Sequence, residues 1–166
     1  MTNLLRNYFY RMMCINVLNS MIKTEVLKPV FTIIDRKVTF QSEREKVKSS
    51  IVEILNAPKS LVSIDINDVR DLFQEGGEIH TYDASVGASM KKRMELLMKL
   101  IIENTKKYEP FSHALVFFFF PEDRPLLMKE LQPFSEWIDS IPGEFMIKWG
   151  MATQSTQELR AIVLLQ

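Results

Sequence analysis

The sequence is poor in the residues that mark secreted, disulfide-bonded and metal-binding proteins. Its 166 residues include one cysteine, Cys14, and two histidines. A single cysteine cannot form an internal disulfide, which fits a reducing cytoplasm, and its apolar neighbours Met13 and Ile15 indicate a buried thiol rather than a nucleophile. His80 and His113 have no cysteine or carboxylate at metal-ligand spacing, so no metal site is expected.

The sequence also has no excess of charge of one sign and no long apolar run. Lys plus Arg and Asp plus Glu number 21 each, so no basic field exists to attract nucleic acid. No apolar run approaches the roughly 18 residues of a membrane-spanning helix. Arg6 and Arg11 interrupt the apolar residues of the N-terminus, which is not typical of a secretory signal. We therefore expect a cytoplasmic protein with no membrane segment and no direct nucleic-acid contact.

What is present is ordinary for a globular chain, with 46% hydrophobic and 25% charged residues. In the first third, apolar residues recur every three or four positions over residues 3–22, which predicts a helix with one apolar stripe. The β-branched run over residues 30–34 predicts a strand. Residues 41–56 predict a charged helix that Pro58 ends.

The remaining two-thirds alternates predicted helices and strands. A short helix follows residue 66 and ends at Gly76 and Gly77, and Pro133 should bend or divide the helix over residues 127–138. The near-continuous apolar run over residues 113–120 is typical of a strand covered on both faces. The other predictions are a strand over 78–83, a small-residue loop over 84–88, a helix from 90 to about 106, and strands over 145–151 and 159–165.

The last two strands are separated by a short polar turn, so we expect them to pair as an antiparallel hairpin. The order of elements predicts an α/β (α+β) protein with a mixed, roughly four-stranded sheet and helices packed against it.

The octapeptide Ser63–Arg70, Ser-Ile-Asp-Ile-Asn-Asp-Val-Arg, carries the most information about function. Asp65 and Asp68 are three residues apart, close to one helical turn, at the point where an apolar run changes into a new helix. Both acids would therefore project from the same side of the helix start. One interpretation is a capping box, in which Asp65 caps the helix and Asp68 is its reciprocal partner.

From about Ser60 to Gln166 the chain resembles the C-terminal, or activation, domain of the tubulin and FtsZ superfamily of filament-forming GTPases. A divergent FtsZ-like or TubZ-like protein would fit. Three stretches carry the resemblance, and their order and spacing match that domain: the acidic loop over 64–70, the glycine-punctuated segment over 77–89 leading into the helix with Arg93 and Glu95, and the final pair of strands over 145–152 and 158–163.

The resemblance implies two parts: residues 1–58 as a remnant of the nucleotide-binding domain and its central helix, and residues 59–166 as the C-terminal-like domain. The family's phosphate-cradling glycine-rich loop is absent, because the five glycines form no phosphate-binding nest. Asp35 follows a predicted strand where the family often has Asn-Asp, and Ser63 replaces a common Asn and can make one polar contact. Both are candidate nucleotide-binding residues, and Arg70 is a third.

By this resemblance, Asp65 and Asp68 would be catalytic residues that reach the GTP of an adjoining subunit, with Mg²⁺ as a further cofactor. Arg70 would pair with Asp71 or Asp68, or line the contact between subunits. The partner would be a second copy in a head-to-tail polymer, used in cell division or in plasmid or phage DNA segregation. The chain by itself would be half of a GTPase site.

Two other classes of function remain open. The chain could be a non-enzymatic module that caps or sequesters polymers of a full-length FtsZ- or tubulin-like partner, and an exposed apolar patch around Phe73 and Gln74 would favour this. An unrelated α/β ligand-binding domain would need a pocket with convergent polar groups, and no motif indicates one.

Overall fold

The computed structural model describes residues 25–58 and 62–166, so Cys14 and the helix predicted over residues 3–22 lie outside the described part. Residues 25–37 are helical. The elements that follow are α2 (Gln41–Asn56), α3 (Ile66–Phe73), β1 (His80–Gly87), α4 (Arg93–Thr105), η1 (Lys106–Tyr108), β2 (His113–Pro121), η2 (Met128–Leu131), α5 (Gln132–Ser140), β3 (Met146–Gln154) and β4 (Glu158–Leu165).

The four strands form one mixed sheet in the order β1-β4-β2-β3. β4 runs antiparallel to both β1 and β2, while β2 and β3 are parallel. The register sets Ala84 opposite Ala161, Phe117 opposite Ile162, and His113 opposite Met146. The predicted mixed four-stranded sheet is therefore confirmed.

The predicted hairpin of the last two strands is wrong. β3 and β4 both form, but β2 lies between them and pairs with each. β2 is apolar on both faces and takes a central position, where neighbours on both sides satisfy its backbone groups. The prediction paired β4 with β3 because the two are adjacent in the sequence. Adjacency does not account for the burial of β2 on both faces, which favours a central position for that strand.

The strand predicted over residues 30–34 is also wrong, because this segment is part of a helix. Val30 and Ile34 are spaced by four and are both buried, as expected for one face of a helix, and Val38, just beyond the end of the helix, continues the same buried row. Packing of that face decides the structure against the β-branched composition. A smaller correction concerns residues 84–88, predicted as a loop: β1 continues to Gly87.

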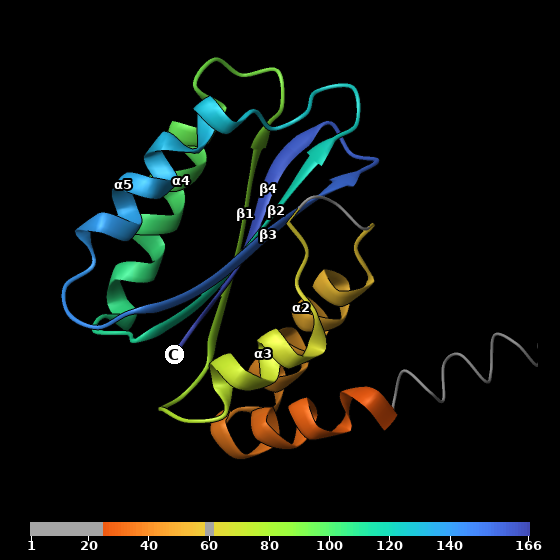
Figure 1. Cartoon of the computed structure of the whole chain (residues 1–166), viewed down its shortest axis with the longest axis vertical. Coiled ribbons are helices and arrows are strands. Elements are labelled where there is room, and N and C mark those ends of the chain that lie inside the picture. The colour runs from red at the N-terminus through yellow and green to blue at the C-terminus, as the bar shows by residue number, and fades with distance from the viewer. Residues whose placement is uncertain (1–24, 59–61) are drawn as a thin grey trace, which may run out of the picture.

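Helices cover both faces of the sheet, which gives three layers (Figure 1). α4 and α5 lie on one face, and α2, α3 and the helix over residues 25–37 lie on the other. Alternate residues of β2 enter the two cores: Val116 and Phe118 pack on the side of α4 and α5, whereas Leu115 and Phe117 pack on the side of α2 and α3. The prediction that this strand is covered on both faces is confirmed.

Pro133 divides the helical segment as predicted. η2 ends at Leu131, α5 begins at Gln132, and the proline lies in the first turn of α5. A proline is tolerated there because the N–H groups of a first turn have no partner within the helix.

Candidate functional site at the start of helix α3

Asp65 is the N-cap of α3, in extended backbone geometry (φ −112°, ψ 175°). Its Oδ1 accepts hydrogen bonds from the backbone N–H groups of Asn67 (2.7 Å) and Asp68 (3.0 Å). Asp68 returns the contact, since its Oδ2 accepts from the backbone N–H of Asp65 at 3.0 Å. The capping box anticipated from the sequence is present, and it satisfies N–H groups that the helix itself cannot.

Asp68 has a second partner that comes from the sheet. Lys148, on the edge strand β3, donates from Nζ to Oδ1 of Asp68 at 2.8 Å. The side chain of Asp68 is 28% exposed and that of Lys148 is 40% exposed, so the ion pair lies at the surface rather than in the core.

The charges around this pair favour an ionised carboxylate at residue 68. Partial burial acts to raise the pKa of Asp68, but the hydrogen bonds from Lys148 and from the Asp65 N–H together outweigh it, and the pKa is lowered. The hydrogen bond to Asp68 raises the pKa of Lys148, as do the nearby charges of Asp71 and Asp65. Asp68 is therefore a fixed negative charge and a hydrogen-bond acceptor at neutral pH, and a poor acceptor of protons.

Asp65 is exposed, and both bonds it accepts use a single carboxylate oxygen. The two acids are thus neither buried within their own domain nor equivalent. Asp68 has a donor on each oxygen, whereas Asp65 presents a carboxylate at the surface. Such a pair can hold and orient a water molecule, with Asp65 the better placed of the two to contact a group from outside.

The other predicted site residues lie in different surroundings. Arg70 donates from Nε and from its terminal nitrogen to Oδ1 of Asp71 at 3.1 and 3.0 Å, which realises one of the three predicted roles. Asp35 lies in the helix over residues 25–37 and pairs with Lys48 Nζ on α2 at 2.7 Å. This contact links two helices and does not bring Asp35 to the acidic pair.

Ser63 and Asp65 help to line a cavity of about 460 Å³ between α2, α3 and the sheet. Most of the wall is apolar, with Val26, Leu55 and Phe117 among its residues. The structure therefore brings Ser63 to the same place as Asp65, while Arg70 and Asp35 pair elsewhere.

An exposed apolar patch around Phe73 and Gln74, which would favour a capping module, is not found. The side chain of Phe73 is 1% exposed and belongs to the core between α3 and the sheet, while Gln74 beside it is exposed. Phe73 completes the buried face of α3 with Val69 and Leu72, so these two residues do not provide the observation that would favour a capping module.

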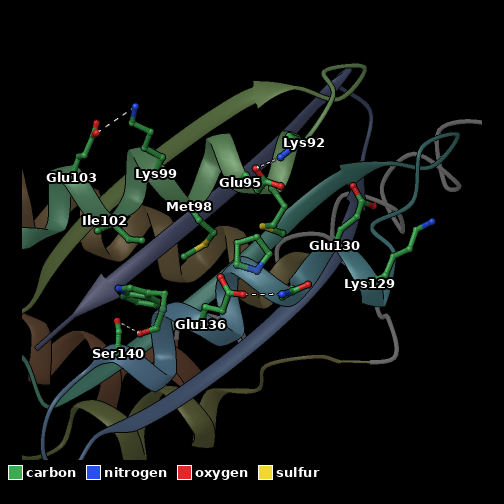
Figure 2. A pocket seen from close by; sticks show the side chains of 14 residues that line it. Lys92, Glu95, Met98, Lys99, Ile102, Glu103, Lys129, Glu130, Glu136 and Ser140 are labelled. Carbon is green, nitrogen blue, oxygen red and sulfur yellow. Dashed lines mark hydrogen bonds and ion pairs between the residues drawn. The ribbon is translucent and has the colours of Figure 1, made fainter.

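A groove of about 860 Å³ runs between α4 and α5 on the opposite face of the sheet (Figure 2). Met98 and Ile102 of α4 face into it, and the ion pairs Lys92–Glu95 and Lys99–Glu103 lie along its α4 side. The five predicted site residues, all within the described part of the chain, lie outside this groove.

No local pattern in the sequence indicates Lys148, which is 80 positions from Asp68. It belongs to an alternating strand pattern in which a lysine is an unremarkable exposed residue. Only the pairing of β3 beside β2, which the hairpin prediction missed, places it next to α3. A prediction with the correct strand order would have placed Lys148 near Asp68.

Within residues 25–58 and 62–166, no group of three or more His, Cys, Asp and Glu side chains is arranged to hold a metal ion. The helices of that same part are all too short or too polar to cross a membrane.

The fold of this chain is similar to that of several solved structures. FtsZ from M. jannaschii (a W319Y mutant) matches with a TM-score of 0.57 and 18% identity, over 74% of this chain and 37% of that chain. A GDP-form protofilament of TubZ from Bacillus thuringiensis serovar israelensis matches with a TM-score of 0.57 and 14% identity, over 74% of this chain and 35% of that chain. CetZ2 from Haloferax volcanii, a GTPγS-bound protofilament, matches with a TM-score of 0.52 and 18% identity, over 76% of this chain and 41% of that chain.

The chain therefore has an FtsZ/tubulin-like fold and resembles the C-terminal portion of such proteins. It spans well under half the length of these relatives. No protein-family model matches the sequence, and a comparison with curated proteins finds no match.

Proposed function

We propose that this chain is the C-terminal portion of an FtsZ/tubulin-like filament-forming GTPase and works with a GTP-binding half. In this division, residues 1–58 are what remains of the nucleotide-binding domain and central helix, and residues 59–166 are the C-terminal-like domain. The shared fold supports the class, and the surface position of the Asp65–Asp68 pair supports the role.

In this proposal the acidic pair meets the GTP of the next subunit. Phosphoryl transfer to water requires a positioned nucleophile and stabilisation of the charge that spreads over the phosphate oxygens. Asp65 orients the attacking water, and Asp68, whose oxygens are already held, maintains the geometry of the helix start. Mg²⁺, held with the nucleotide, would neutralise phosphate charge.

Head-to-tail association follows from this arrangement, because each subunit completes the site of its neighbour. Contacts that join different surfaces of identical subunits produce open filaments. The solved TubZ and CetZ2 relatives are described as protofilaments, which supports self-association as the partnership of this chain. We propose a cytoplasmic filament that serves in cell division or in DNA segregation.

The proposal is tested on the assembly that contains both this chain and its GTP-binding half, on one polypeptide or two. We expect Asp65→Asn and Asp68→Asn to polymerise with GTP yet release phosphate about 100-fold more slowly, the scale of loss when a positioned catalytic group is removed. Phosphate release and pelleted polymer are measured in parallel.

Asp71→Asn is the matched control, since Asp71 lies on the same helix and pairs with Arg70. We expect that variant to retain wild-type turnover. Wild-type turnover in the Asp65 variant would reduce this residue to a helix cap and overturn the proposal.

A further inference from the structure

Lys148 connects the last part of the chain to the acidic pair. It stands on β3, the edge strand parallel to β2, and its Nζ lies 2.8 Å from Oδ1 of Asp68. The second oxygen of that carboxylate accepts the N–H of Asp65 at 3.0 Å. Two donors, one from the helix and one from the sheet, therefore fix the Asp68 side chain.

The local charge also requires a cation. Asp65, Asp68 and Asp71 lie within two turns of α3, and Arg70 is bound to Asp71. A surface with two or three carboxylates repels a triphosphate unless a positive charge lies close by. Lys148 is that charge: it is 40% exposed, it contacts Asp68, and the charges of Asp71 and Asp65 act on it as well.

We propose that Lys148 is a positioning residue of this site: its ammonium group holds the Asp68 carboxylate in place and offsets the charge of the acidic pair where it faces the triphosphate of the next subunit. This inference rests on the proposed function and extends it to a residue outside the acidic loop.

The first test uses the 166-residue chain alone and measures the titration of the Asp68 carboxyl by ¹³C NMR. In Lys148→Met the donor and the positive charge are lost, so the midpoint of Asp68 moves to higher pH; in Lys148→Arg it stays close to that of the wild type. The other charged groups that act on this pair, Asp65 and Asp71, are left in place, and so is Arg70, which is bound to Asp71.

Lys99→Met is the matched control, because Lys99 belongs to an exposed ion pair on α4. It should leave the Asp68 titration unchanged. Far-UV circular dichroism checks the fold of each variant, and Lys148→Gln replaces Lys148→Met if the latter does not fold. An unchanged Asp68 midpoint in a folded Lys148 variant overturns the inference.

The second test measures GTP turnover in the complete assembly. We expect Lys148→Met to lower kcat about tenfold to 100-fold, as small misplacements of catalytic groups do, and Lys148→Arg to recover most of it. The acid limb of the pH–rate profile should move to higher pH in Lys148→Met, a change that a purely structural contact between α3 and β3 would not produce.

The two proposals fail separately. Wild-type turnover in Asp65→Asn and Asp68→Asn overturns the proposed function and this inference together. Slow turnover in those variants, with wild-type turnover and pH profile in Lys148→Met, overturns the role of Lys148 alone.

Discussion

At the scale of the residue, Asp65 has two roles that can be separated by chemistry. As an N-cap it needs only an oxygen that accepts backbone hydrogen bonds, and asparagine supplies one nearly as well as aspartate. As a catalytic group it needs a negative charge. A substitution that keeps the oxygen and removes the charge therefore tests one role without the other.

We predict that Asp65→Ala lowers the free energy of unfolding by about 1 kcal/mol, whereas Asp65→Asn changes it by only a few tenths. The alanine variant leaves the N–H groups of Asn67 and Asp68 without their acceptor. Urea denaturation of the chain, followed by circular dichroism, measures both values. Equal losses in the two variants would show that the charge of Asp65, rather than its hydrogen bonds, stabilises α3.

Gly150 is a residue at which close neighbours leave no room for a side chain. It lies within β3, and a Cβ built there would be 2.6 Å from the ring of Phe117. The sequence placed this glycine in the right strand, but only the pairing of β3 with β2 explains why no side chain fits.

At the scale of the element, one buried arginine holds the start of α4 to two loops and to η2. The Arg93 guanidinium donates to both carboxylate oxygens of Glu130 at 2.8 Å and to the carbonyl oxygens of Ala88, Arg124 and Pro125. The sequence indicated Arg93 only as part of a resemblance to a family helix. Apart from Ala88, its partners are 31 to 37 positions away, and no local pattern reveals them.

We predict that Arg93→Met destabilises the fold by about 3 kcal/mol, because it leaves a partly buried carboxylate and three carbonyl groups without their donor. Lys99→Met, which removes an exposed ion pair, should cost less than about 0.5 kcal/mol. Urea denaturation at neutral pH compares them. A loss as small as that of the control would mean that water replaces the arginine.

The Arg93–Glu130 ion pair makes the stability of the fold depend on pH. The hydrogen bond from Arg93 lowers the pKa of Glu130 despite partial burial. Its contribution to stability is therefore complete above the ordinary pKa of a glutamate and is lost as the pH falls through the lowered value. Glu130→Gln should lose less stability than the wild type between neutral and acidic pH, measured as the difference in unfolding free energy.

The elements themselves were largely predictable. The helices over 41–56 and after residue 66, the strand over 113–120 and the break near Pro133 follow from local periodicity and proline chemistry. The errors came where long-range packing decides: the helix over residues 25–37, whose β-branched residues face a core, and the pairing of the last two strands. The capping box was predictable because its partners are three residues apart, and Lys148 was not.

At the scale of the whole molecule, an arginine on β4 ties α2 to the sheet. Arg160 makes forked contacts to Asp83 on β1 and to Glu53 on α2, and stacks over the ring of Phe119 at 5.5 Å. These contacts raise the pKa of Arg160, so its charge is permanent. Two contacts therefore hold this region to the sheet. Arg160 links α2, the helix that precedes α3 in the chain, to β4, and Lys148 links Asp68 of α3 to β3.

We predict that the 166-residue chain alone shows no saturable GTP binding. Gly87 and Gly150 lie in strands, and the remaining three glycines lie outside any loop that leads into a phosphate-cradling helix N-terminus. Fluorescence titration with labelled GTP measures this, with CetZ2 from Haloferax volcanii, whose structure contains GTPγS, as the positive control. Saturable binding would mean that the chain contains a nucleotide site of its own.

The central place of β4 has a consequence for biosynthesis. β1 is hydrogen-bonded to β4 and to no other strand of the described sheet, and β4 is the last of the four to leave the ribosome. Until Glu158–Leu165 has emerged, β1 has no partner and the sheet has a gap between β1 and β2. This domain can therefore complete its fold only after translation of its final strand, and until then its nascent chain presents unpaired strand edges that invite aggregation.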